Sequence, residues 1–423
     1  MKAIIKYLND IYSQVKNLTA EKKKDLVLTS FALFVVLLSY PITRSVSEAY
    51  FIQQFGAQKS PLVWLYSVAL LSLAVIIYNH YQSRFQAQKL FLFTALFTFA
   101  FFLLCSGGIL FGQKLWGYPL FIWKEVYVIL LLHMAFGYLN TMIDVKVAKI
   151  LYGPIGALMA SAGIVGGALT SWLTSFCSIH HILLVGNLIV LSSAALFYRT
   201  TPIYFEKKKA ESNESKPDTP LRAIGDAKKY VYYITLIIAI SQFVINLAQF
   251  KFNVLFAQIL PDVNLKTAYL GKIYFYMNSM GLLTQLILTP VLLKCVSNRN
   301  IHYVIPFLYL GISIFGFGIG GNLLVPVATA FIVIKGVDYS LFSTVKEILY
   351  FILDNRQKYG AKYLVDMVSY RAAKGVISVI LLFKVCQSPW VVNFMLFAFL
   401  GLWPVALFLL FREEQKIIER KKR

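Results

Sequence analysis

The sequence predicts an all-α membrane protein with about twelve transmembrane helices in two six-helix halves. Of its 423 residues, 58% are hydrophobic and only 14% are charged, and the mean hydropathy is +0.67. Soluble globular proteins carry about a quarter charged residues. The apolar residues form long runs, and the connections between the runs alternate between strongly and weakly basic.

Twelve apolar runs are long enough to cross a hydrocarbon layer of about 30 Å, which takes about 20 helical residues. They cover residues 26–46, 61–81, 89–112, 119–142, 148–176, 180–198, 231–258, 269–294, 301–321, 322–349, 361–386 and 389–411. Each run is expected to form one transmembrane helix.

The distribution of Lys and Arg predicts the orientation of the chain. These cations cluster in the N-terminal tail, the even-numbered connections and the C-terminal tail, whereas the odd-numbered connections hold isolated ones. By the positive-inside rule, both termini are expected in the cytoplasm and the protein in the cell (inner or plasma) membrane. The net charge of +22 then reflects topology and some affinity for anionic membrane lipid, so we expect no nucleic-acid partner.

Three polar segments flank two predicted helical bundles, 26–198 and 231–411. Residues 1–25 are expected to form a cytoplasmic amphipathic segment, because Ile4, Leu8, Ile11, Val15 and Leu18 recur at helical spacing. Residues 199–230 read as a basic cytoplasmic linker and 412–423 as a basic cytoplasmic tail. Six spans on each side of a long cytoplasmic loop are typical of transporters of the major facilitator type.

Charges inside the spans are candidate functional residues, because each costs about 2.5–3.5 kcal/mol at mid-membrane on insertion scales. Arg44 and Glu48 lie four residues apart on one face of the first span, although an ion pair that snorkels to the surface is an alternative. Lys251 lies in the seventh span between apolar residues. Lys124 and Glu125 are expected at the outer interface.

In the second half, Lys335 and Asp338 lie three residues apart in the tenth span, where a salt bridge would neutralise both; this pair could be functional or structural. Helical spacing in the eleventh span predicts a single polar stripe formed by Asp366, Tyr370, Arg371 and Lys374.

Charges at the cytoplasmic ends of spans are candidates for a gate. Asp144 and Lys149 lie where the fourth span passes into the fifth, and either a structural network or ligand contact is possible there. Lys346 and Glu347 close the tenth span.

The deep cations outnumber the deep acids, which favours an anionic substrate, and guanidinium forks suit phosphate or carboxylate. We expect the substrate-binding residues to be Arg44, Lys251, Tyr370, Arg371 and Lys374. The expected coupling or gating residues are Glu48, Asp144, Lys149, Lys335, Asp338, Lys346, Glu347 and Asp366.

Small residues in the fifth span are placed for close helix packing. The stretch ASAGIVGGALTS brings Gly163, Gly166 and Gly167 onto closely spaced faces. Such residues let transmembrane helices approach each other.

The sequence offers no sign of catalysis or of a bound metal or cofactor. It contains no HExxH or GxSxG motif, and its four cysteines lie singly in apolar segments without CxxC spacing. We therefore expect a protein that is not an enzyme and that needs no cofactor.

One stretch points to a known family. VKEILYFILDNRQKYGAKYLVDMVSYRAAKGVISVI resembles the signature of the tenth and eleventh spans of the ATP/ADP translocases, the nucleotide transport proteins of plastids and obligate intracellular bacteria. The matching positions are Lys346, Glu347, Tyr350, Leu353, Asp354, Lys358, Lys362, Asp366 and Lys374. Arg44 in YPITR resembles the family's first-span arginine, whereas Ser47 replaces a lysine of that family. The resemblance implies a major facilitator-like fold and a nucleotide or other phosphorylated anion as cargo.

These observations together predict a secondary active transporter that moves a small anionic metabolite by alternating access, with exchange as one form of coupling. Two alternatives stay open. One is a transporter of the same fold for a lipid, a siderophore or a peptidoglycan fragment. The other is a transport-inactive membrane sensor or partner-binding protein. A monomer is favoured.

Overall fold

The computed structural model describes residues 13, 15–204 and 220–422. These residues are almost entirely helical, and among them the only strand-like feature is an isolated bridge between Gln86 and Tyr204. The predicted all-α class is confirmed. Most of the expected amphipathic segment, with Ile4, Leu8 and Ile11, and residues 205–219 of the expected linker lie outside the described residues.

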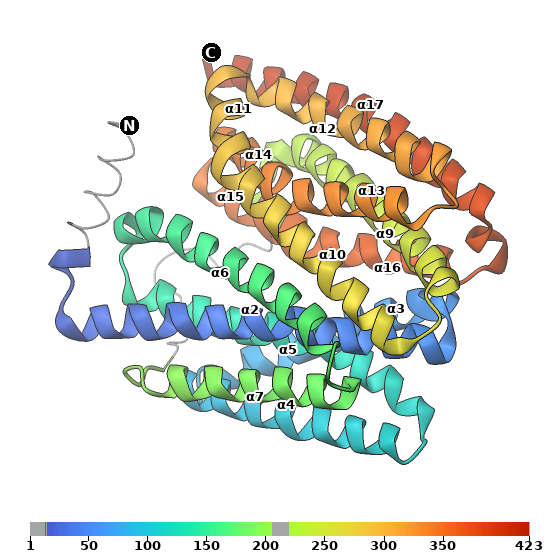
Figure 1. Ribbon diagram of the computed structural model, residues 1–423. Helices are drawn as coiled ribbons and strands as arrows, with labels where there is room; N and C mark the ends of the chain where they lie inside the picture. The colour runs from blue at the N-terminus through green and yellow to red at the C-terminus, as the bar shows by residue number, and fades with distance from the viewer. Residues whose placement is uncertain (1–12, 14, 205–219, 423) are drawn as a thin grey trace. The chain divides into compact units, whose positions relative to one another are not determined.

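The first half of the chain forms six long helices that overlap the six predicted spans (Figure 1). They are α2 (Ala20–Phe55), α3 (Ser60–Tyr81), α4 (Ala87–Leu110), α5 (Gly117–Met142), α6 (Val145–Leu173) and α7 (Ile179–Tyr198). Short 3-10 turns, η1 (Ala57–Lys59) and η2 (Lys114–Trp116), precede α3 and α5. Helix α2 extends beyond the predicted run 26–46 at both ends.

The second half begins with α8 (Pro220–Ala223) and η3 (Gly225–Ala227), and its spans are more often interrupted. The seventh and twelfth spans are the single helices α9 (Lys228–Ile259) and α17 (Pro389–Lys422). The eighth span comprises α10 (Val263–Leu283), η4 (Thr284–Leu288) and α11 (Thr289–Cys295). The ninth comprises α12 (Asn298–Ser313) and η5 (Ile314–Ile319). The tenth comprises α13 (Leu324–Val337), η6 (Asp338–Phe342), α14 (Ser343–Leu349) and η7 (Tyr350–Ile352). The eleventh comprises α15 (Asn355–Lys362), η8 (Tyr363–Ser369) and α16 (Tyr370–Ile380), and η9 (Lys384–Gln387) follows it.

The segments η4, η5, η6 and η8 are π-helical, and all four lie in the second half. A π-helical segment closes wider turns than an α-helix, so it shifts the helical register of the residues that follow. In the part of the chain that the structure describes, eleven helices are long and apolar enough to cross a membrane. The stretch absent from these eleven is the charged, π-interrupted eleventh span. The prediction of about twelve spans is confirmed to within this one.

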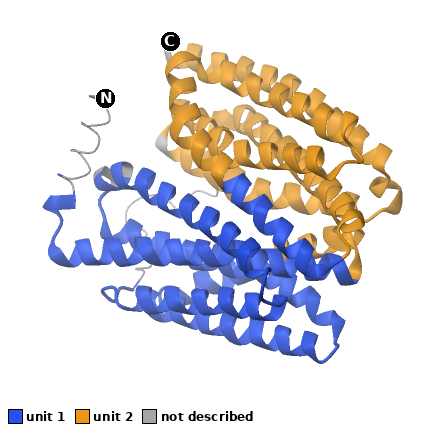
Figure 2. Ribbon diagram, viewed as in Figure 1, with its two compact units in different colours: residues 1–54, 69–208, 262–278 blue, residues 55–68, 209–261, 279–423 orange. Residues whose placement is uncertain are grey.

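The chain forms two compact units (Figure 2). Unit 1 contains residues 1–54, 69–208 and 262–278, and unit 2 contains residues 55–68, 209–261 and 279–423. Each unit is built mainly from one half of the chain. The helices α3 and α10 are divided between the units, so that the first part of α10 packs with helices of the first half.

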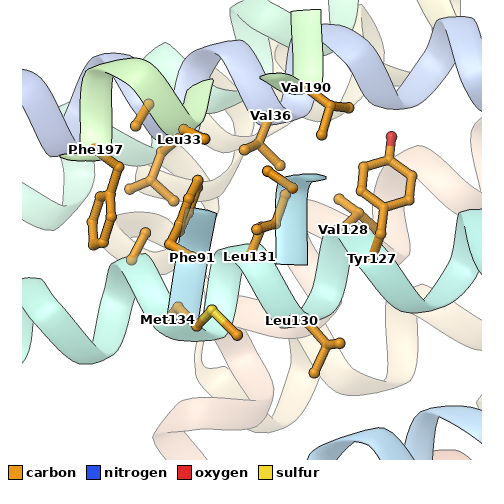
Figure 3. Packing of buried hydrophobic residues seen from close by; sticks show 14 of the residues in the cluster. Leu33, Val36, Phe91, Tyr127, Val128, Leu130, Leu131, Met134, Val190 and Phe197 are labelled. Atoms are coloured by element: carbon orange, nitrogen blue, oxygen red, sulfur yellow. The ribbon is translucent and has the colours of Figure 1, made fainter. Parts of the chain in front are cut away.

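In unit 1, α4 packs against α5 and α7, and its core is a continuous apolar cluster (Figure 3). Phe91 stacks on Phe197 with ring centroids 4.4 Å apart, and Tyr127 meets Phe102 edge to face. In unit 2, α9 packs against α13, α16 and α17. Because lipid tails are as apolar as these side chains, close packing is the main force that holds such helices together.

The glycines of the fifth span confirm the predicted close helix packing. A Cβ atom on Gly166 would lie 2.4 Å from the carbonyl oxygen of Leu38 in α2. One on Gly167 would lie 2.5 Å from the amide nitrogen of Phe275 in α10. Helix α6 therefore touches the backbones of α2 and α10, and its contact with α2 falls beside Pro41, three residues before Arg44.

Replacing Gly167 by alanine should lower the stability of the protein by about 1–3 kcal/mol, because the backbone of α10 must move to admit the methyl group. The measurement is thermal unfolding in detergent, followed by tryptophan fluorescence. Gly107→Ala is the matched control, since nothing lies within 4 Å of a Cβ atom there. Equal melting temperatures for the two variants would contradict the packing role of Gly167.

Candidate functional site

A cluster of charged residues lies inside unit 1, and we call it the Glu48 cluster. Its members are Arg44 and Glu48 of α2, Lys124 and Glu125 of α5, and Tyr274 of α10. Glu48 accepts hydrogen bonds from Arg44 Nε at 3.0 Å, Lys124 Nζ at 2.9 Å and the Tyr274 hydroxyl at 2.5 Å. Lys124 Nζ also pairs with Glu125 at 2.6 Å. Three helices that are distant in sequence thus meet at one carboxylate.

The Glu48 cluster is buried. Arg44 is 8% exposed, Glu48 2% and Lys124 0%. The alternative that Arg44 and Glu48 snorkel to the surface is wrong, because both side chains are buried among other residues of unit 1. Two cations and two acids balance one another, which is the condition under which charges are tolerated in an apolar interior.

The guanidinium of Arg44 is held in place by contacts that engage only one of its three nitrogens in a hydrogen bond within the described residues. Its Nε bonds to Glu48, and its plane lies near the rings of Tyr40 and Tyr274, at 5.5 and 4.7 Å from their centroids. The two terminal nitrogens make no hydrogen bond with any residue that the structure describes. A guanidinium fixed in this way can offer its remaining N–H groups to a phosphate or carboxylate.

Unit 2 holds a second polar group, which we call the Asp366 network. It consists of Lys346 and Glu347 of α14, Tyr350 of η7, Lys362 of α15 and Asp366 of η8. Lys346 Nζ lies 2.6 Å from Asp366 Oδ1, and Lys362 Nζ lies 2.5 Å from Glu347 Oε2. Five of the residues that carry the family resemblance are therefore brought together by the fold, whereas Asp354 pairs with Lys421 instead.

The expected stripe in the eleventh span is only partly present. Asp366 lies in the π-helical η8, where it pairs with Lys346 and accepts a hydrogen bond from the Tyr350 hydroxyl. The α-helical spacing that placed Asp366 on one face with Arg371 does not hold across this segment. Tyr370 faces the network, since Lys346 Nζ lies 5.1 Å from its ring centroid.

Arg371 and Lys374 follow in α16, three residues apart and both half-buried. Arg371 makes no hydrogen bond or ion pair with the described part of the chain. The backbone carbonyl of Lys374 accepts a hydrogen bond from Ser378. Arg371 is therefore a cation inside unit 2 whose donors are available.

The predicted salt bridge between Lys335 and Asp338 does not form within the described structure. Asp338 is buried and accepts a hydrogen bond from Ser241 at 3.4 Å, whereas Lys335 Nζ lies over the ring of Tyr339. Lys335 lies in α13 and Asp338 is the first residue of the π-helical η6.

Among the remaining predicted positions, Asp144 and Lys251 belong neither to the Glu48 cluster nor to the Asp366 network. Asp144 is exposed and lies directly before α6. The side chain of Lys149 is not among the described parts of the structure. Lys251 lines a separate cavity of unit 2 whose lining residues include neither Tyr370 nor Arg371. Within unit 2, the lining of this cavity therefore does not include the predicted substrate residues of the eleventh span.

Sequence reasoning missed Lys124 and Tyr274 as members of the site. The adjacent Lys124 and Glu125 near the start of a span were visible, but nothing in the sequence showed that Lys124 would reach Glu48. Tyr274 is one tyrosine among 26. Its role depends on the docking of α10 in unit 1, which no local pattern encodes.

The fold is that of known transporters. A bacterial homologue of the human lysosomal transporter Spinster, solved in an inward-facing and unoccupied conformation, aligns with a TM-score of 0.65 and 12% identity over 95% of this chain and 99% of its own. A variant of the nucleoside transporter NupG aligns with a TM-score of 0.63 and 12% identity, over 92% and 99%. A bacterial homologue of the iron transporter ferroportin gives 0.60 and 15%, over 90% and 98%.

These identities are low, so the likeness establishes the fold alone: an all-α, multi-pass membrane protein of the major facilitator-like class. No protein-family model and no curated protein sequence matches this chain. The resemblance to ATP/ADP translocases consequently stays a hypothesis about cargo.

Proposed function

We propose that this protein is a secondary active transporter of a small anionic metabolite, a nucleotide or another phosphorylated compound, and that it works by alternating access. The observation that carries the proposal is a pair of arginines, Arg44 and Arg371, each with guanidinium donors that no described residue uses. Arginine forks match phosphate oxygens in geometry and charge. Lys374, three residues after Arg371, would add a second cation on α16.

Arg44 is well suited to recognise such a cargo. Its contact with Glu48 fixes the guanidinium before a ligand arrives, which reduces the entropy that binding would cost. The buried ring of Tyr274 braces the guanidinium, whereas the ring of Tyr40 is half-buried and lies beside it, where a planar base could stack. Such stacking would favour a nucleotide over a compact anion such as inorganic phosphate.

The Asp366 network is a candidate for the contacts that break and re-form during transport. The side chains of Lys362 and Glu347 are 40% and 43% exposed. Ion pairs this accessible to solvent contribute only about 0–1 kcal/mol, so they can open at little cost. The buried Glu48 cluster, in contrast, is expected to stay intact throughout the cycle.

Exchange is the form of coupling that we favour. In the absence of cargo, Arg371 lacks an acidic partner within the described residues, so its charge opposes a change of state until an anion compensates it. The termini are proposed to be cytoplasmic, the location to be a cell membrane and the protein to be a monomer.

A thermal-shift screen of the detergent-purified protein tests the proposal. ATP, ADP and AMP should raise the melting temperature, because a ligand at 100 times its Kd stabilises the folded state by about 2.7 kcal/mol. Adenosine, which lacks phosphate, should have no effect at equal concentration. Stabilisation by adenosine but by none of the phosphates would overturn the anionic cargo, and stabilisation by siderophores or peptidoglycan fragments would replace it.

A further inference from the structure

A cavity of about 810 Å³ lies in unit 2, and we call it the Lys251 cavity. It is enclosed by the last turns of α9, by η5 and the residues after it, and by the first turns of α17. None of the residues of the Asp366 network lines it, and neither does Arg371. The cavity is thus separate from the proposed substrate residues of this unit.

Lys251 is the only charged residue among those that line the cavity. Its Nζ donates to the carbonyl oxygen of Phe317 at 2.8 Å and to Asn393 Oδ1 at 2.5 Å. Both acceptors are neutral, so one of the three ammonium protons is unused. The face of the Phe317 ring, with its centroid 5.3 Å from Nζ, attracts the charge weakly, and no acidic residue of the lining neutralises it. An uncompensated charge in apolar surroundings is costly, and an anionic ligand would remove that cost.

The polar and apolar groups of the cavity are arranged in layers along the helix axes. Gln258, Asn322 and Gln387 lie outermost, near the ends of their segments. Asn393, the partner of Lys251 Nζ, lies about 6 Å along α17 from Pro389, and Phe397 about 12 Å, at 1.5 Å per residue. The cation therefore lies between an outer layer of amides and an inner layer of aromatic side chains.

The mouth of the cavity has the character of a membrane interface. Trp390, the second residue of α17, is 85% exposed there, and tryptophans concentrate at the level of lipid headgroups. Glycine at 321 keeps the floor open beside the ammonium, because a Cβ atom would meet the Phe317 carbonyl at 2.8 Å and lie 3.6 Å from Lys251 Nζ. A ligand that contacts the amides, the Lys251 ammonium and the aromatic side chains at once has a polar head, one negative charge and an apolar tail.

We propose that the Lys251 cavity binds an anionic phospholipid. The lipid phosphate contacts Lys251 Nζ, the headgroup lies among the amides of Gln258, Asn322 and Gln387, and an acyl chain runs along Phe394 and Phe397. The inference concerns a lipid of the surrounding membrane and is independent of the transported cargo.

Native mass spectrometry of the delipidated full-length protein tests this proposal, with phosphatidylglycerol and phosphatidylcholine of identical acyl chains as probes. The wild type should bind phosphatidylglycerol about tenfold more tightly, because its headgroup leaves a net negative charge for Lys251. Lys251→Met should abolish the preference and Lys251→Arg should keep it. Lys384→Met, which removes an exposed cation of η9, should behave as the wild type.

Phe394→Ala tests the contact with the acyl chain. The Phe394 side chain is already largely exposed, so its removal should not disturb folding. It should weaken both lipids while the preference for phosphatidylglycerol persists. Equal affinities for the two lipids in the wild type, or an unchanged preference in Lys251→Met, would overturn the proposal. So would competition by glycerol 3-phosphate as strong as that by the lipid, because the site would then belong to a soluble anion.

Discussion

Replacing Glu48 by glutamine is expected to lower the free energy of unfolding by about 3–5 kcal/mol, because removing one partner of a buried ion pair leaves the other charges uncompensated. Glutamine keeps the size of the side chain but not its charge. Arg44 and Lys124 would then share one acid, Glu125, inside the apolar core of unit 1. The measurement is thermal or denaturant unfolding in detergent.

The control is an ion pair of similar length at the surface. Glu413 and Lys416 lie 2.6 Å apart in α17, and the Lys416 side chain is half exposed. Glu413→Gln should cost no more than about 1 kcal/mol, because solvent screens exposed pairs. If both variants lost equal stability, burial would not be what makes the Glu48 cluster important.

A double-mutant cycle sharpens this test. Lys124→Met alone should also destabilise the protein strongly, since it leaves Glu48 and Glu125 with Arg44 as their only cation in the cluster. The double variant Glu48→Gln, Lys124→Met keeps the balance between Arg44 and Glu125. Its loss should therefore be smaller than the sum of the single losses by about 0.5–3 kcal/mol, the range found for residues in direct contact.

Replacing Arg371 by methionine should instead weaken ligand binding and leave stability unchanged. Arg371 has no hydrogen bond or ion pair with the described residues, so its removal breaks no contact of that kind. Losing a charge-assisted hydrogen bond to the cargo costs about 1.5–3 kcal/mol, which corresponds to a roughly 10- to 150-fold weaker affinity. The concentration of ATP that gives half of the maximal thermal shift measures this change.

Arg222→Met is the matched control for Arg371, because Arg222 is an exposed arginine of the same unit in the short helix α8. It should keep the affinity of the wild type. Unchanged ATP binding in Arg371→Met would remove Arg371 from the substrate site. A fall in melting temperature equal to that of Glu48→Gln would assign it a structural role.

Much of the fold could be predicted from the sequence, because the physical signal is local. The runs 61–81 and 180–198 correspond closely to α3 (Ser60–Tyr81) and α7 (Ile179–Tyr198), since apolar length alone decides where a helix can cross a membrane. The π-helical segments of the second half could not be predicted, because each depends on packing that no local pattern encodes. The segment η8 is why the α-helical spacing behind the predicted stripe from Asp366 to Lys374 does not hold from end to end.

The candidate site could be predicted only in part. The spacing that places Arg44 and Glu48 on one face of a helix is a local property, and the two side chains pair there at 3.0 Å. The burial of Lys124 and the hydrogen bond from Tyr274 depend on which helices meet, and the sequence of a single chain does not contain that information in readable form.

Uptake into proteoliposomes tests the central claim of anion transport most directly. Purified protein is reconstituted, and labelled ATP is added outside vesicles that contain unlabelled ADP or buffer alone. We expect saturable accumulation of label in the ADP-loaded vesicles, little in the empty ones, and a roughly 10- to 150-fold higher half-saturating ATP concentration with Arg371→Met. Accumulation that is equal in loaded and empty vesicles would contradict exchange, and no entry of any phosphorylated compound above that of protein-free liposomes would contradict anion transport itself.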